Sequence, residues 1–180
     1  MPVPLSVPAV LDLTQRGSLS VVRRGAQRVR MHRYGLIESI RFFTTYAFLN
    51  FVDEADAAKF WHNGQQSTGQ GIFLRGRQCM VNWAKCPPLD NSIRRAVQEK
   101  GATRHIEVGP INHQTTEPQV AELVKQFGEI ESIRLTPERG VAIVTMTTIA
   151  ESLAAQEALH GLKMGDNPPW HLDVKYTRIL

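Results

Sequence analysis

The chain has 180 residues, of which 42% are hydrophobic, and it contains no apolar run of the roughly 20 residues that a membrane helix needs. This length allows one domain or two small ones, and the composition argues against a disordered chain. The formal net charge is +4, but the first hundred residues sum to +7 and the rest to −3. A basic first half indicates a phosphate-bearing partner for that half, whereas the second half needs none.

The first 33 residues give the weakest signals. Ala9–Leu13 can form a strand, and Ser18–Arg33 can form a helix that Gly25 interrupts. This second stretch carries five arginines and no acidic residue. Three alternatives therefore remain open: the first strand and helix of a domain, a basic arm that contacts phosphate, or an organelle transit segment.

The segment Thr44–Phe51 alternates as a half-buried strand does. Tyr46 and Phe48 lie on one side, and the other side is a good core face formed by Ala47, Leu49 and Phe51. Two rings on the solvated face of a sheet are either covered by another element or bind something flat. The flat partner that we expect is a set of nucleic-acid bases.

An internal repeat decides the predicted architecture. The run Ile-Glu-Ser-Ile-Arg in Tyr34–Phe42 recurs 93 positions later in Phe127–Leu135. Further matches follow in the same order at nearly the same offset, including an alternating strand, a pair of alanines and a final strand with an aromatic residue. The chain is therefore predicted to contain two copies of one unit.

The second copy predicts the order β-α-β-β-α-β. Its strands are expected over Arg104–Ile111, Ser132–Leu135, Val141–Met146 and Trp170–Tyr176, and its helices over Glu117–Phe127 and Ile149–His160. We therefore predict an α+β chain with two ferredoxin-like domains, each a four-stranded antiparallel sheet with two helices on one face. The domains are expected at residues 1–85 and 104–180, joined by a linker over 86–103 with a short helix at Ser92–Lys100.

The third strand of this unit resembles that of the RNA recognition motif (RRM) family, whose pattern is basic-Gly-aromatic-small-aromatic-aliphatic-x-aromatic. The segment matches from Tyr46 onward, whereas Thr44 and Thr45 replace the basic residue and the glycine. By this resemblance, bases stack on Tyr46 and Phe48. Two copies make the chain similar to tandem RRM proteins, with the general features of fungal multi-RRM regulators of differentiation.

Polar and flexible side chains around the two rings complete the predicted site of the first copy. Arg41 is expected beside Tyr46 on the open face. The last strand contributes Met80 and Asn82, and an amide such as that of Asn82 can read a base edge. Lys85, just after this strand, can reach a phosphate.

The second copy departs from the family at the ring positions. Val141 and Ile143 stand where the rings should be, and Glu107 replaces an aromatic residue of the first strand. A carboxylate in the middle of the sheet face repels phosphate. We therefore expect this copy to make a weak RNA contact, or to pack on the first copy or on another protein.

Three cations on this second face remain candidate RNA contacts, namely Arg134, Arg139 and Lys175. The same face also carries Glu107 and Asp173. We favour the pairing of these opposite charges across the sheet over contact with RNA.

No residue pattern converges on catalysis. The sequence has no phosphate-binding loop, nucleophile motif or paired-carboxylate signature. Cys79 and Cys86 lack metal-type spacing with each other or with histidines, and Cys79 reads as a core residue. We predict a protein that is not an enzyme, needs no cofactor or metal, and works in a reducing compartment, the cytoplasm or the nucleus.

The sequence therefore favours single-stranded RNA binding by a tandem RRM protein in post-transcriptional regulation, with stacking on the first copy and an auxiliary second copy. The alternative is a protein-interaction module built on divergent RRM folds. A small-molecule regulatory domain is a third class, for which the sequence offers no pocket.

Overall fold

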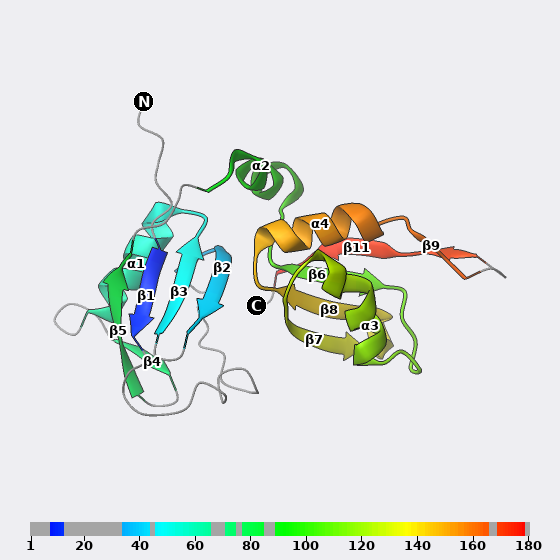
Figure 1. Ribbon diagram of the computed structural model, residues 1–180, viewed down its shortest axis with the longest axis horizontal. Coiled ribbons are helices and arrows are strands. Elements are labelled where there is room, and N and C mark those ends of the chain that lie inside the picture. The colour runs from blue at the N-terminus through cyan, green and yellow to red at the C-terminus, as the bar shows by residue number, and fades with distance from the viewer. Residues whose placement is uncertain are drawn as a thin grey trace. The chain divides into compact units, whose positions relative to one another are not determined.

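The computed structural model describes residues 8–12, 34–43, 46–65, 71–74, 77–84, 89–165 and 169–178. The chain separates into two compact units, Met1–Asn91 and Ser92–Leu180, each with its own sheet and hydrophobic core (Figure 1). Within the described ranges, no helix is long and apolar enough to cross a membrane.

The first unit is a five-stranded antiparallel sheet with one described helix. Its elements are β1 (Pro8–Asp12), β2 (Ile37–Phe42), β3 (Tyr46–Phe51), α1 (Glu54–Gly64), β4 (Ile72–Leu74) and β5 (Arg77–Trp83). The strand order is β2-β3-β1-β5-β4, so β1 pairs with both β3 and β5 at the centre. The strand predicted near Ala9 is thereby confirmed, one residue earlier than expected. The helix predicted over Ser18–Arg33 lies outside the described residues.

The helix α1 covers one face of this sheet (Figure 1). It begins where the Asp53 carboxylate accepts a hydrogen bond from the Ala55 amide at 2.8 Å, which satisfies one of the free amides of the first turn. Ala57 and Phe60 of α1 are fully buried against β3 and β5. Cys79, predicted to be a core residue, is also buried, and no described helix lies over the opposite face of the sheet.

The last strand of the first unit is longer than the predicted strand. It begins with a hairpin, in which β4 pairs with Arg77–Cys79 before β5 reaches β1. Trp83 lies on the same face as the buried Val81, is 40% exposed and stacks on Trp61 of α1 with ring centres 5.6 Å apart. Trp83 is the last residue of β5, so it lies at the margin of the area that α1 covers.

The second unit begins with α2 (Asn91–Lys100), of which only Asn91 is assigned to the first unit. Its main sheet has four antiparallel strands in the order β11-β6-β8-β7. The further elements are β6 (His105–Gly109), α3 (Glu117–Val124), β7 (Ile130–Thr136), β8 (Val141–Met146), α4 (Ile149–Leu159), β9 (Lys163–Met164), β10 (Trp170–His171) and β11 (Asp173–Tyr176). The predicted last strand is thus divided. Trp170–His171 pairs with β9 as a hairpin, the buried Leu172 follows, and only β11 joins the sheet.

The two Ile-Glu-Ser-Ile-Arg runs form the same local structure, as the repeat predicts. In each unit the register between the second and third strands shifts at the glutamate, which lies in a β-bulge. Each run follows a glycine with positive φ, 149° at Gly35 and 156° at Gly128. A Cβ there would lie 1.9 Å from Asp56 and 2.2 Å from Glu151 respectively, so both positions exclude larger residues.

Candidate nucleic-acid interface

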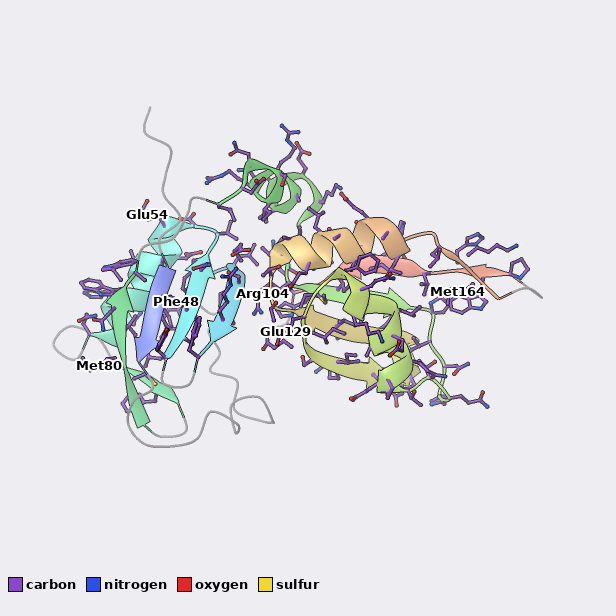
Figure 2. All side chains as sticks on the ribbon, in the orientation of Figure 1. Phe48, Glu54, Met80, Arg104, Glu129 and Met164 are labelled. Carbon is purple, nitrogen blue, oxygen red and sulfur yellow. The ribbon has the colours of Figure 1, made fainter. Side chains whose placement is uncertain are left out.

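The strand β3 places Tyr46 and Phe48 on the face opposite α1. Burial alternates along this strand, with Ala47, Leu49 and Phe51 buried and the residues between them partly exposed. Figure 2 labels Phe48 on this face of the first unit. The alternation predicted from the sequence is therefore present in the fold.

A third ring, which the sequence analysis missed, joins these two. Phe43 is 42% exposed and stacks on Tyr46, with ring centres 4.7 Å apart and planes 19° apart. Phe48 meets both rings edge-on, at 5.5 Å from Phe43 and 5.4 Å from Tyr46. We call these three residues the ring cluster. Because Phe43 covers one face of Tyr46, the exposed part of Phe43 continues the aromatic surface outward.

The turn between β2 and β3 explains the position of Phe43. Its amide donates a hydrogen bond to the Tyr46 carbonyl at 2.8 Å, so these two residues face each other at the end of the hairpin. This register puts Arg41 opposite Phe48, not beside Tyr46 as predicted. Only two residues separate Phe43 from Tyr46, and so short a connection was the signal that could have located both side chains.

The ring cluster continues across the sheet through backbone register. Phe48 lies opposite Val10, which lies opposite Asn82. One row further along, Tyr46 and Met80 lie on either side of β1, and Met80 is 57% exposed. The structure therefore brings Asn82 and Met80 onto the face of the two predicted rings, whereas Lys85 lies outside the described residues.

The second unit repeats this row with different chemistry. Arg134 lies opposite Ile143, Ile143 opposite Glu107, and Glu107 opposite Lys175. In the first unit the same places belong to Arg41, Phe48, Val10 and Asn82. The predicted loss of rings in the second copy is therefore a feature of its sheet face.

Opposite charges pair on this second face. Arg139 binds the Glu107 carboxylate at 3.0 Å, and Lys175 contacts Asp173. The contact of Arg139 with Glu107 agrees with the predicted pairing across the sheet, whereas Lys175 pairs with a residue of its own strand. Ile143, between Glu107 and Arg134, is only 6% exposed, so the aliphatic surface available on this face is small. Of the three candidate cations, Arg134 is exposed and has no ion pair to a described residue.

Two polar groups in the second unit are buried, one with hydrogen-bond partners and one without. Arg104 is 7% exposed and binds Glu131 at 2.8 Å and the Met146 carbonyl at 3.1 Å, so it ties β6 to the bulge of β7. The Tyr176 hydroxyl is buried and finds no hydrogen-bond partner among the described residues. Burial, with a smaller contribution from Glu157, raises the pKa of Tyr176 to about 12.

Tyr176 borders a cavity of about 490 Å³ beside β11. Two of its lining cations, Lys100 and Lys175, already pair with Glu157 and Asp173. In the described part of the chain, no three His, Cys, Asp or Glu side chains are close enough to hold a metal ion. Among the described residues, the largest group of exposed aromatic and polar side chains therefore lies on the face of the first sheet opposite α1.

Residues 106–169 match the family model for the RNA recognition motif. This segment belongs to the RNA recognition motif family. The match falls within the second unit, from β6 to the end of the β9–β10 connection, so the RRM assignment does not depend on aromatic residues at the ring positions.

Curated relatives are similar over longer stretches. The chain is 29% identical over 139 residues to RNA-binding protein MRN1 of Saccharomyces cerevisiae, which covers 71% of this chain and 22% of that protein. It is 22% identical over 159 residues to Meiotically up-regulated gene 24 protein of Schizosaccharomyces pombe, covering 88% of this chain and 21% of the relative. The chain thus spans about a fifth of the length of these relatives.

Among solved structures, a Sex-lethal protein–RNA complex is 18% identical, and the match covers 94% of this chain and 98% of that one. Its TM-score is 0.36. A TM-score this low carries no detailed correspondence between the two chains.

Proposed function

We propose that the chain binds single-stranded RNA as a tandem RRM protein. Its two ferredoxin-like domains would comprise residues 1–85 and 104–180, with a linker over 86–103. The family match over 106–169 and the similarity to a yeast protein named as RNA-binding support RNA as the ligand. An aligned stretch of 139 residues necessarily includes parts of both units, which supports the tandem arrangement. The biological role is post-transcriptional regulation in the cytoplasm or the nucleus.

The observation that carries this proposal is the ring cluster on the face of the first sheet that no described helix covers. A contiguous group of apolar side chains on a protein surface typically marks an interaction site. Nucleic-acid bases are flat partners that stack on aromatic rings. Each base stacked on an aromatic side chain is worth roughly 1–3 kcal/mol by substitution. Two stacked bases would therefore supply a few kcal/mol before any contact with phosphate.

Other side chains on this face add contacts of different kinds. Arg41, exposed opposite Phe48, is placed to contact a phosphate or to lie over a base. Asn82 lies in the same row as Phe48, on the other side of β1, and offers a donor and an acceptor to a base edge. Met80 supplies apolar surface, and Lys85 is proposed as a phosphate contact from the sequence alone.

The second domain is auxiliary in this proposal. Glu107 occupies the middle of its sheet, and Arg139 and Lys175 are engaged by carboxylates, so few cations remain for phosphate. Arg134 is the exposed cation best placed to contact RNA. The second candidate function, in which this domain binds a protein and RNA binding is confined to the first domain, is favoured by the ion pairs of Arg139 and Lys175, which leave few cations for phosphate.

The test is titration of a labelled single-stranded RNA of mixed sequence with the full chain, at low and moderate salt. A Tyr46→Ala, Phe48→Ala double variant is compared with Trp170→Ala, which removes an exposed ring from the second unit. We expect the double variant to lose most of the affinity and the control to keep it. Equal affinities of the wild type, the double variant and Trp170→Ala, with a steep dependence on salt, would instead assign the interaction to arginine–phosphate contacts.

A further inference from the structure

The hairpin formed by β4 and β5 carries an exposed ring that neither the repeat nor the family pattern predicts. Phe73 is 52% exposed and lies opposite Gln78, whereas the preceding Ile72 lies opposite Cys79, and both of these are buried. Side chains alternate between the two faces of a sheet. Phe73 therefore lies on the face of Met80 and Asn82, away from α1.

This position makes Phe73 an extension of the face that holds the ring cluster. Met80, at the β5 end of the row that begins at Tyr46, lies between the ring cluster and Phe73. Figure 2 labels Phe48 and Met80 on β3 and β5 of this unit. With strands about 4.8 Å apart and a rise of about 3.3 Å per residue, the backbones of Phe73 and Tyr46 are roughly 16 Å apart.

We propose that Phe73 and Met80 form a second base-binding site on the first sheet, separate from the ring cluster and reached only by a longer RNA strand. This inference rests on the proposed RNA-binding function. Phe73 would supply the flat ring on which a base stacks, and the Met80 thioether would supply adaptable apolar contact beside it.

The size of the gap sets the length of RNA required. A single strand whose bases are splayed onto the protein covers more per nucleotide than the about 3.4 Å of stacked bases, but a strand of only three nucleotides is still too short to cover roughly 16 Å. A very short RNA therefore occupies only the ring cluster, which has three rings. A longer RNA binds the ring cluster and Phe73 at the same time. Because the RNA is already held at the ring cluster, the contact with Phe73 is intramolecular and adds to the affinity.

The matching hairpin of the second unit supports a nucleic-acid partner for this side of the sheet. By register, Lys163 and His171 of β9 and β10 occupy the places of Phe73 and Gln78. Both are exposed, and both can donate to phosphate. A ring on one hairpin and a cation on the other are the two kinds of side chain that bind single-stranded nucleic acid.

The experiment compares oligouridines of about three and about ten nucleotides, of which the longer lies within the range of known single-strand site sizes. The full chain is titrated with each, as wild type, Phe73→Ala, Phe73→Leu and Phe73→Tyr. We expect Phe73→Ala and Phe73→Leu to weaken the longer RNA by roughly five- to 150-fold and to leave the shorter one unchanged. Phe73→Tyr, which keeps a ring, should bind both like the wild type.

Two variants serve as controls. Trp83→Ala removes an exposed ring from the α1 side of the same sheet and should not change binding of either RNA. Tyr46→Ala with Phe48→Ala should weaken both lengths. The proposal is overturned if Phe73→Ala binds the longer RNA as tightly as the wild type, or loses both lengths equally. If the wild type binds neither RNA, the proposed function itself fails, and this inference fails with it.

Discussion

At the scale of single residues, the stacking of Phe43 on Tyr46 changes which ring surface is available to a ligand. The two rings lie 4.7 Å apart with nearly parallel planes, so one face of Tyr46 is already in contact. Phe43 itself remains 42% exposed. In the proposed function, the outer surface of Phe43 therefore belongs to the ring surface offered to bases, although the family pattern has no place for it.

We predict that Phe43→Ala weakens RNA binding by about 1 kcal/mol or more, because a base loses the outer ring on which it stacks. RNA titration of the variant, with circular dichroism to check folding, measures this effect. Phe43 is on the surface, so the fold should be preserved. Tighter binding by the variant would contradict the prediction, since it would mean that Phe43 occupies the place of a base on Tyr46.

Tyr176 predicts a dependence of stability on alkaline pH. Its pKa is raised to about 12 in the folded protein, mainly by burial, against 10.0 ordinarily. The folded state therefore holds the Tyr176 proton more strongly than the unfolded chain does. The resulting contribution to the free energy of unfolding is fully present below about pH 10. It is lost as the pH rises from about 10 through about 12, because the unfolded chain ionises first.

The measurement is urea unfolding of the wild type and Tyr176→Phe across this range. The free energy of unfolding of the wild type should fall more steeply than that of the variant. The variant should be at least as stable at neutral pH, because the buried hydroxyl has no described hydrogen-bond partner to lose. Parallel pH profiles for the two proteins would show that Tyr176 is not responsible.

At the scale of elements, each second strand starts from a glycine that the chain packs closely. The position of a Cβ at Gly128 lies 2.2 Å from the Cγ atom of Glu151. That carboxylate is held by the Thr148 amide at 2.9 Å and by the Thr147 hydroxyl at 2.7 Å. The glycine thus allows β7 to begin against the capped start of α4.

We predict that Gly128→Ala lowers the free energy of unfolding by about 2–3 kcal/mol, from a φ of 156° together with displacement of the Glu151 side chain. Gly101→Ala is the matched control. Gly101 also has positive φ, 65°, but no atom lies within 4 Å of its Cβ position, so this substitution should cost only about 1 kcal/mol. Chemical denaturation of both variants compares the two costs, and equal values would exclude the steric contribution.

At the scale of the whole molecule, the two units use the same sheet register for different chemistry. The first unit places a ring, an arginine and an amide along its central row. The second places an isoleucine between an arginine and the carboxylate Glu107. This difference agrees with the division of charge along the chain, +7 in the first hundred residues and −3 in the rest. It is the physical basis for assigning the two units unequal roles.

We predict that Glu107→Gln strengthens RNA binding and makes it more dependent on salt. The substitution removes a negative charge from the middle of the second sheet and releases Arg139 from its 3.0 Å ion pair. One additional phosphate contact would steepen the salt slope by about 0.7 for a single strand. Stability should change little, because an exposed ion pair is typically worth about 0.2–1 kcal/mol. Unchanged affinity and slope would mean that the second sheet does not contact RNA.

The sequence by itself determined the features that depend on local periodicity. Alternation along Thr44–Phe51 assigned Tyr46 and Phe48 to one face, and helical spacing with a following glycine located the helices of the second unit to within a few residues. Alignment of the two copies also identified Val141 and Ile143 at the ring positions of the second copy. The first strand of the first unit could not be aligned in this way.

Only the tertiary structure decided what depends on register between distant strands. It placed Pro8–Asp12 between β3 and β5, moved Arg41 from Tyr46 to Phe48, and brought Phe43 and Phe73 onto the face of Tyr46 and Phe48. Register is set by turn geometry and by pairing across the sheet, and a shift of one residue reverses the face of every side chain. The short connection between β2 and β3 is a local signal for Phe43 and Arg41, but no local pattern contains the register of the other strands, so those positions follow from the assembled sheet.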